Sequence, residues 1–318
     1  MAISSPSLNI TVTNDEKEVR DLIALGFCPV ECSIGGKSLV DDLLMDHHGE
    51  NSHLESVAVR AYRDHFGARR NDPRFVLVGS PDADATFAIA ALAGLLPHPS
   101  VEVAPYLPEH VKAAKQRDLL QLAETVAVID TDPIGRNLSA MPFGAELLLW
   151  NAMVSFSEDT ELTALSGVWL WAQITANAPS RKPLVEHSKV LESQRREEAK
   201  KETIVDLGNG IGYIEESTCW GFDVWYGRNV NHASDLPTGW KFGVVLARVA
   251  SSGAITIGSP NQAVAEVLFG EGGLKNVFPY LPREGWGGRE AIGGSPRGEK
   301  MSIEELIEAA EKVKSLIR

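Results

Sequence analysis

Acidic side chains and histidines in the first half of the chain form three short groups that suit metal-assisted chemistry. The first is Asp46-His47-His48, the second is Asp82-Ala83-Asp84, and the third centres on Asp130. Carboxylate and imidazole ligands together favour Mn²⁺, Zn²⁺, iron or Co²⁺ over Ca²⁺. Two such cations close together lower the pKa of a bridging water and offset the charge of a phosphate group. These groups therefore predict a two-metal site for hydrolysis at phosphorus.

Two of the groups follow segments that the sequence predicts as buried strands. Phe75 to Gly79 is a short, continuous apolar run that leads into the Asp82-Ala83-Asp84 loop. Thr125 to Ile129 is a second such run, and it ends at Asp130. An Ala- and Leu-rich helix is predicted between them, at 85–96, which gives the βαβ pattern of a parallel sheet. Ligands of such sheets bind outside the carboxyl ends of the strands, where these carboxylates would lie.

Each group also has a purely structural interpretation. An Asp after a strand is often a turn residue or the N-cap of the next helix, so Asp84 could be a cap and Asp82 simply solvated. Asp130 could likewise be a turn residue, and Asp132 offers the same spacing. Adjacent histidines also occur on exposed loops. The metal site is favoured because all three groups occur in one chain.

The remaining pattern predicts an α/β protein in which a parallel-sheet domain is followed by a smaller α/β domain. At 318 residues the chain exceeds the usual size of one hydrophobic core. We predict a first domain at 1–180, a charged helical linker at 181–205 and the smaller domain at 206–318. Further helices are predicted at 15–25, 54–66, 110–124, 161–176 and 302–317, the last with a capping box formed by Ser302 and Glu305. Short strands are predicted at 211–214, 221–226, 242–249 and 254–257.

Composition argues against several other classes of protein. The net charge of -13 disfavours tight binding to long duplex nucleic acid, because neutralising phosphates needs a basic surface. Three cysteines cannot build a disulfide framework, and Cys28 and Cys32 lack a second pair for a zinc site, so buried, inert thiols are favoured. No segment has the pattern of a signal peptide or a membrane span. We therefore predict a cytoplasmic protein with a small phosphorylated substrate and no contact with membranes.

The three groups resemble the motifs of the DHH phosphoesterase superfamily. The segment VLVGSPDADATFAIAAL at 76–92 is similar to the first motif of the family, a strand followed by a DxD loop and a helix. VAVIDTDP at 126–133 is similar to the second motif, whose aspartate bridges both metals, and MDHHG at 45–49 matches the triplet. Members such as the RecJ-type exonucleases and the nanoRNases hydrolyse phosphoesters or phosphoanhydrides. The resemblance implies a nucleotide, short oligonucleotide, cyclic dinucleotide or polyphosphate as substrate.

The resemblance also implies a role for each matched residue. The metal ligands would be Asp46, His47, Asp82, Asp84, Asp130 and, for the fourth motif, Asp159. His48 would face the substrate phosphate and would be the catalytic residue together with Asp84. The cofactor would be two Mn²⁺ ions, with Mg²⁺, Co²⁺ or Zn²⁺ as alternatives, and these ions would activate a hydroxide.

The second half of the chain resembles DHHA1, the substrate-binding domain associated with this family, which ends in a glycine loop. That loop is matched by Gly287-Gly288-Arg289 and by Gly293-Gly294. Its amides and the Arg289 guanidinium could hold a phosphate or carboxylate group, and Arg228 is a further candidate for substrate contact. The structural alternative is a glycine turn that packs against the last helix.

The order and detail of the motifs differ from those of the family. The triplet follows the first two motifs in the family but precedes both here, which we interpret as a permuted strand. Val78 stands where many members have a first-motif histidine, and Arg289 stands where the glycine loop has one.

Two other functions fit the same residues. A family member that has lost catalysis would bind a nucleotide or phosphate without turnover, as the missing first-motif histidine suggests. An unrelated two-domain transferase would bind one Mg²⁺ through its acidic loops and would not depend on His47. The sequence leaves a homodimer open, and it identifies neither the substrate nor the metal.

Overall fold

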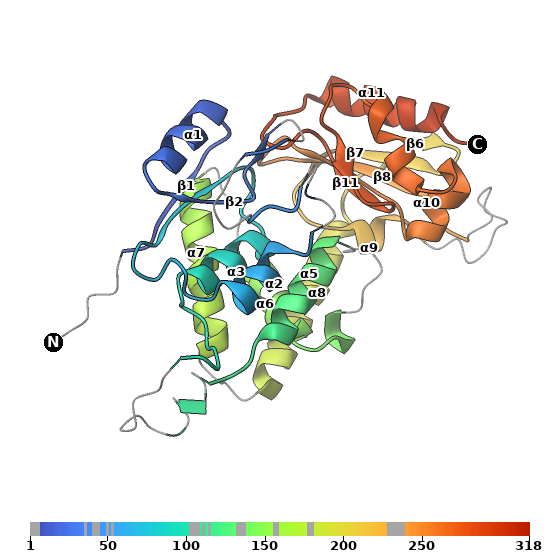
Figure 1. The fold of residues 1–318 in the computed structure, drawn as a ribbon. Coiled ribbons are helices and arrows are strands. Elements are labelled where there is room, and N and C mark those ends of the chain that lie inside the picture. The colour runs from blue at the N-terminus through green and yellow to red at the C-terminus, as the bar shows by residue number, and fades with distance from the viewer. Residues whose placement is uncertain are drawn as a thin grey trace. The chain divides into compact units, whose positions relative to one another are not determined.

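The computed structural model describes residues 7–34, 37–39, 45–48, 51, 54–101, 109, 112–113, 116–131, 138–154, 159–176, 181–227 and 239–318. Within them the chain forms two compact units, coloured by residue number in Figure 1. Unit 1 contains the described residues up to Asp130 and 138–191, and unit 2 contains Thr131 and the described residues of 192–318. The division falls inside helix α8 (Arg181–Ala199). Each unit combines helices with its own sheet, so the predicted α/β class is confirmed.

A parallel three-stranded sheet organises unit 1. Its order is β1 (Asn9–Val12), β5 (Arg74–Leu77) and β2 (Cys28–Val30), with β5 in the centre. The last three residues of β5 are fully buried, as expected for a central parallel strand covered on both faces. The strand predicted from the apolar run after Arg74 is thereby confirmed. A short hairpin of β3 (Ser33–Ile34) and β4 (Lys37–Ser38) follows β2.

The helices of unit 1 share hydrophobic clusters with the strands of this sheet. They are α1 (Glu16–Ala24), α2 (Val57–Asp64), α3 (Ala83–Leu92), α5 (Leu120–Thr131), η2 (Leu138–Ala140), α6 (Gly144–Met153), α7 (Thr160–Ala176) and the first part of α8. The helices predicted at 15–25, 54–66, 85–96 and 161–176 are confirmed. The helix predicted at 110–124 overlaps α5 from Leu120 onward. Residues 110–111 and 114–115 of that prediction lie outside the described residues. No described helix is both long enough and apolar enough to cross a bilayer.

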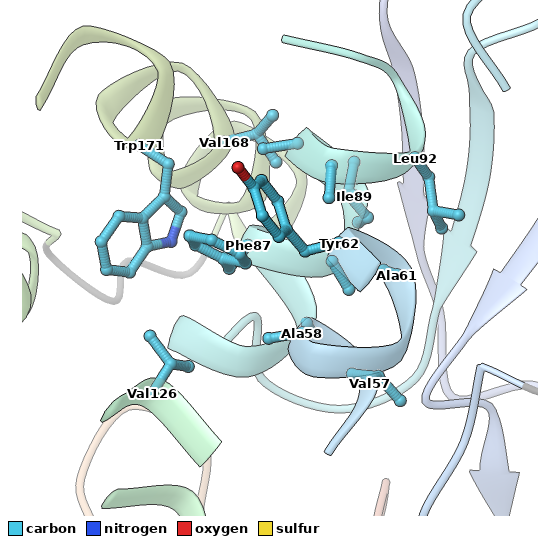
Figure 2. Packing of buried hydrophobic residues seen from close by; sticks show 14 of the residues in the cluster. Val57, Ala58, Ala61, Tyr62, Phe87, Ile89, Leu92, Val126, Val168 and Trp171 are labelled. Atoms are coloured by element: carbon cyan, nitrogen blue, oxygen red, sulfur yellow. The ribbon is translucent and has the colours of Figure 1, made fainter. Parts of the chain in front are cut away.

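Helix α3, which follows the DxD loop, lies in the middle of the core of unit 1. All of its residues from Asp84 to Leu92 are buried. Phe87 packs edge-on against Trp171 of α7, with ring centroids 5.3 Å apart, and its ring centroid lies 6.1 Å from that of Tyr62 in α2 (Figure 2). Trp171 Nε1 also donates a hydrogen bond to the hydroxyl of Thr86. Contacts with α2 and α7 therefore fix the helix that carries Asp84.

The second predicted strand is wrong, because 125–129 lies within helix α5. Leu122, Ala123 and Val126 are buried at the spacing of one helix face. A short apolar run fits a buried strand or a buried helix equally well, and only its packing decides between them. Asp130 consequently lies in the last turn of a helix and not at the end of a strand.

A six-stranded sheet organises unit 2. Its order is β10 (Gly287–Gly288), β11 (Ile292–Gly294), β9 (Ile255–Gly258), β8 (Val244–Val249), β7 (Ile211–Ser217) and β6 (Val205–Gly208). Strands β7 and β8 are parallel and the other neighbours are antiparallel. The helices are α9 (Phe222–Trp225), α10 (Gln262–Phe269), η3 (Gly273–Asn276), η4 (Phe278–Tyr280) and α11 (Ile303–Ser315). The strands predicted at 211–214, 242–249 and 254–257 are confirmed, and so is the capping box of Ser302 and Glu305.

The strand predicted at 221–226 is wrong, because this segment forms the short helix α9. Its aromatic residues favour strands in general, which is why the composition suggested one. Phe222, Trp225 and Tyr226 are buried together in one cluster, at helical spacing. Trp225 Nε1 also donates to the carbonyl of Ala199 at 3.1 Å. Burial of the rings in one place thus overrides their local preference.

We expect Phe87→Ala to lower the free energy of unfolding of unit 1 by about 3–5 kcal/mol, because it leaves a cavity between α2, α3 and α7. Denaturant unfolding monitored by tryptophan fluorescence measures the change. Leu162→Ala is the matched control in the same unit, since Leu162 is 57% exposed and should change stability by less than about 0.5 kcal/mol. Equal effects of the two substitutions would contradict the placement of α3 in the core.

Candidate metal centre

Glu31 enters the site from the carboxyl end of strand β2. Its side chain is fully buried, and its backbone has a φ of 52°, a left-handed conformation that is uncommon outside glycine. Its amide donates to the carbonyl of Met45 at 2.7 Å, which ties the end of β2 to the residue before the Asp46-His47-His48 triplet. Glu31 is not among the residues that the sequence pattern singled out. The signal that could have found it is a carboxylate directly after the short apolar run of β2.

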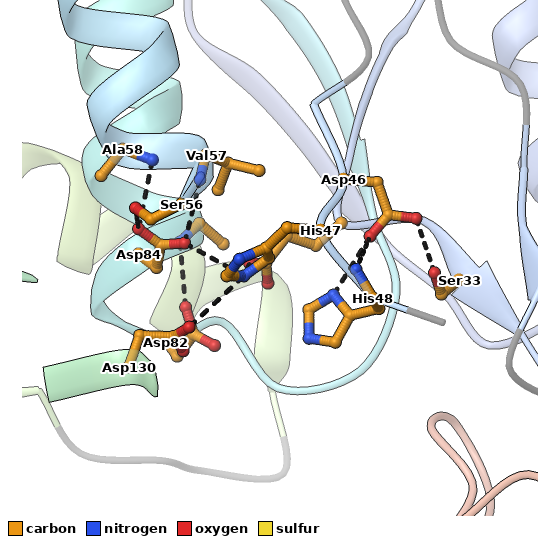
Figure 3. Close-up of polar contacts among 12 residues, drawn as sticks. Ser33, Asp46, His47, His48, Ser56, Val57, Ala58, Asp82, Asp84 and Asp130 are labelled. Carbon is orange, nitrogen blue, oxygen red and sulfur yellow. Dashed lines mark hydrogen bonds and ion pairs between the residues drawn. The ribbon is translucent and has the colours of Figure 1, made fainter. Parts of the chain in front are cut away.

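His47 is the centre of the site. Its Nε2 lies 3.3 Å from Asp84 Oδ2 and 3.4 Å from Asp130 Oδ2 (Figure 3). The same nitrogen lies 3.3 Å from Glu31 Oε1. The imidazole is only 3% exposed, and neither ring nitrogen has a hydrogen-bond partner among the described residues. Burial by itself lowers the pKa of His47, but the contact with Glu31 and the charges of Asp84 and Asp130 outweigh it and raise that pKa to about 10.

Asp84 holds two parts of the site together. One carboxylate oxygen accepts from the Ser56 hydroxyl and from the amide of Ala58 at 3.1 Å, and the other accepts from the amide of Val57 at 3.2 Å. It therefore caps the N-terminus of α2, where the helix dipole favours negative charge. Burial still raises the pKa of Asp84 above its usual value; His47 opposes this rise and Glu31 adds to it.

Asp82, the first residue of the DxD pair, makes a different contact. Its Oδ1 accepts from the amide of Ala85 at 2.9 Å, so Asp82 is the N-cap of α3. The capping role that the sequence suggested for Asp84 on α3 thus belongs to Asp82, while Asp84 reaches across to α2.

Two overlapping sets of ligand atoms form here, Glu31-His47-His48 and His47-Asp84-Asp130, and within each set the atoms lie within 4.8 Å of one another. A set of imidazole and carboxylate ligands suits Mn²⁺, Zn²⁺, iron or Co²⁺. Nε2 of His47 lies at ion-pair distance from three carboxylate oxygens, and its buried Nδ1 has no hydrogen-bond partner among the described residues. The residues present therefore fit a divalent transition metal.

Asp46, a predicted ligand, belongs to neither set. It is fully buried, and it accepts hydrogen bonds from the hydroxyls of Ser33 and Ser38 and from the main chain of His48. Burial raises the pKa of Asp46, but the hydrogen bonds from His48, Ser33 and Ser38 outweigh it and lower that pKa to about 2. In Figure 3, Asp46 and Ser33 lie on one side of His47, and Asp84 and Asp130 lie on the other.

The other predicted site residues lie elsewhere. Asp159 is exposed at the start of α7, where its carboxylate accepts from the amide of Leu162 at 2.9 Å, and it is in neither ligand set. Arg228 lies outside the described residues. Cys28 and Cys32 of unit 1 are buried thiols without a disulfide, as predicted.

The predicted glycine loop of unit 2 is a tight hairpin. Gly287 and Gly288 form β10, Gly293 and Gly294 belong to β11, and the amide of Arg289 donates to the carbonyl of Ile292 at 2.6 Å. A Cβ on Gly293 would lie 2.4 Å from the ring of Phe278 and 2.6 Å from the carbonyl oxygen of Gly287. Close packing thus accounts for this glycine, and a role of the hairpin in substrate binding stays a prediction.

No family model matches the chain. Searches of curated proteins and of solved structures likewise gave no match.

We expect the affinity for Mn²⁺ to rise about tenfold per pH unit between pH 6 and 8, with release of about one proton per ion. The pKa of His47 is about 10 without a metal, so the imidazole is protonated throughout this range and must lose its proton to become a ligand. Calorimetric titration in buffers of different ionisation enthalpy measures the released proton. The dependence should vanish in His47→Gln and persist in His187→Gln, an exposed position on α8. A pH-independent affinity in the wild type would contradict His47 as a ligand.

Proposed function

We propose that the chain is a metal-dependent phosphoesterase that hydrolyses a phosphoester or phosphoanhydride bond in a small phosphorylated substrate. The observation that carries the proposal is the contact of His47 Nε2 with oxygens of Glu31, Asp84 and Asp130 at 3.3–3.4 Å. These four side chains come from four separate segments of the chain, and a buried set of carboxylates with an imidazole is typical of a transition-metal site. We propose in addition that unit 1 is a DHH-type domain and unit 2 a DHHA1-like domain.

The residues of the site divide into those that would hold cations and those that would meet the substrate. His47, Glu31, Asp84 and Asp130 would hold the metal. Bound cations of this kind lower the pKa of a water and stabilise the charge that develops on phosphate oxygens. His48 is 34% exposed and adjoins the ligands, so it is positioned to contact a phosphate oxygen that enters from solvent.

Charge supports a small substrate. The net charge of -13 does not favour a long polyanion, which binds through many basic contacts. A nucleotide, dinucleotide or short phosphate chain needs only local neutralisation, which bound cations supply.

We expect Asp130→Asn to lower kcat/KM at least about 100-fold, because loss of a residue that only supports a ligand already costs 10–100-fold. The assay is release of phosphate or nucleotide with Mn²⁺ from pyrophosphate, polyphosphate, phosphoadenosine phosphate, dinucleotides and a generic phosphodiester. Asp130 suits the test better than Asp84, since removing the Asp84 charge would also weaken the N-terminus of α2.

Asp64→Asn is the matched control, because Asp64 is exposed on α2 and pairs with Arg63. It should leave turnover unchanged. Binding of Mn²⁺ without turnover of any substrate would contradict the proposed hydrolase activity and favour a phosphate-binding protein of the same fold. Turnover that survives Asp130→Asn would mean that the reaction occurs elsewhere.

A further inference from the structure

Asp46 makes contacts that no metal-ligand role explains. Its Oδ2 accepts hydrogen bonds from the hydroxyl of Ser33, at 2.6 Å, and from that of Ser38. Its Oδ1 lies 3.0 Å from the main-chain nitrogen of His48 and 3.1 Å from the Nδ1 of the same residue. One carboxylate therefore joins the β3–β4 hairpin to both the backbone and the ring of His48.

The main chain of Asp46 is held as well. Arg60 of α2 donates from Nη2 to the carbonyl of Asp46 at 2.9 Å, and from Nε to the carbonyl of Glu55 at 3.0 Å. Asp46 is thus fixed from the hairpin on one side and from α2 on the other. Its carboxylate has little freedom to rotate away from His48.

These contacts select one tautomer of His48. An ionised carboxylate only accepts hydrogen bonds, and two serine hydroxyls and a backbone amide already donate to Asp46. The ring Nδ1 beside it must then carry a hydrogen, so Nε2 is the acceptor nitrogen of the neutral imidazole. Histidines at metal sites are oriented in this way by a carboxylate, which also makes the acceptor nitrogen more basic.

We propose that Asp46, Ser33 and Ser38 form a positioning unit that holds His48 in the Nδ1–H tautomer, with Nε2 as the atom that meets the group bound beside Glu31 and His47. The catalytic consequence rests on the proposed function, whereas the tautomer does not. Asp46 is a positioning residue and the two serines orient it in turn. This assigns the aspartate of the triplet to the support of its second histidine.

Nitrogen NMR of the full-length, metal-free protein labelled with ¹⁵N-histidine tests the tautomer directly. Loss of one signal set in His48→Gln assigns the residue, and the spectra are taken at a pH where this ring is neutral. The wild type should show Nδ1–H. Asp46→Ala should shift His48 to the Nε2–H form that an unconstrained imidazole prefers. Nε2–H in the wild type, or no change in Asp46→Ala, would overturn the proposal.

Kinetics give the second test. Asp46→Ala should lower kcat about 10–100-fold with a smaller change in KM, because orientation and not substrate contact is lost. Asp46→Asn keeps one acceptor oxygen and should recover part of the loss, and the Ser33→Ala/Ser38→Ala double variant should fall between wild type and Asp46→Ala. Asp64→Ala is the matched control and should match wild type in both measurements. A kcat of Asp46→Ala equal to that of Asp64→Ala would reject the positioning role.

The two tests also separate this inference from the proposed function. Absence of turnover in the wild type would contradict the proposed hydrolase activity. The NMR result would still decide the tautomer of His48. Should Asp46→Ala fail to fold, the double serine variant carries both measurements, since each serine loses only a hydroxyl. A double variant with wild-type tautomer and wild-type kcat would then reject the role of the serines in the positioning unit.

Discussion

Three carboxylates share a small volume around the imidazole of His47, and the electrostatics of that volume constrain the rest of unit 1. Glu31 and Asp84 are fully buried there, and Asp130 is three-quarters buried. A buried carboxylate destabilises the fold by several kcal/mol unless charge or hydrogen bonds compensate it. In the metal-free chain the compensation comes from a proton on His47, whose pKa is about 10, and from the donors around Asp84. A divalent cation would supply more positive charge in the same place.

The surrounding elements are arranged to make that burial tolerable. Strand β2 delivers Glu31 through a left-handed backbone conformation, which is tolerated only where the surroundings enforce it. The N-terminus of α2 directs two amides at Asp84, so one carboxylate both starts a helix and faces His47. Occupancy of the centre and the local stability of α2 are consequently linked through Asp84. This linkage is physical and does not depend on which reaction the site performs.

Neutral donors surround two of the buried carboxylates. Ser33, Ser38 and Ser56 are hydroxyls that each serve a buried carboxylate, the first two at Asp46 and the third at Asp84. Hydroxyls stabilise a buried negative charge without cancelling it, so they favour the ionised form of the carboxylate that accepts from them. At Asp46, burial raises the pKa, but hydrogen bonds from His48, Ser33 and Ser38 outweigh it and lower that pKa to about 2.

The sequence by itself determined the elements whose patterns are local: β5 with α3, helices α1, α2 and α7, and the capped helix α11. It also singled out His47, Asp84 and Asp130, because imidazole and carboxylate side chains are typical ligands of metal ions. Tertiary structure alone decided that 125–129 is a helix, since an apolar run has no period that separates the two forms. It alone added Glu31 and distinguished the contacts of Asp82, Asp84 and Asp46, because which side chains converge depends on contacts between residues far apart in the chain.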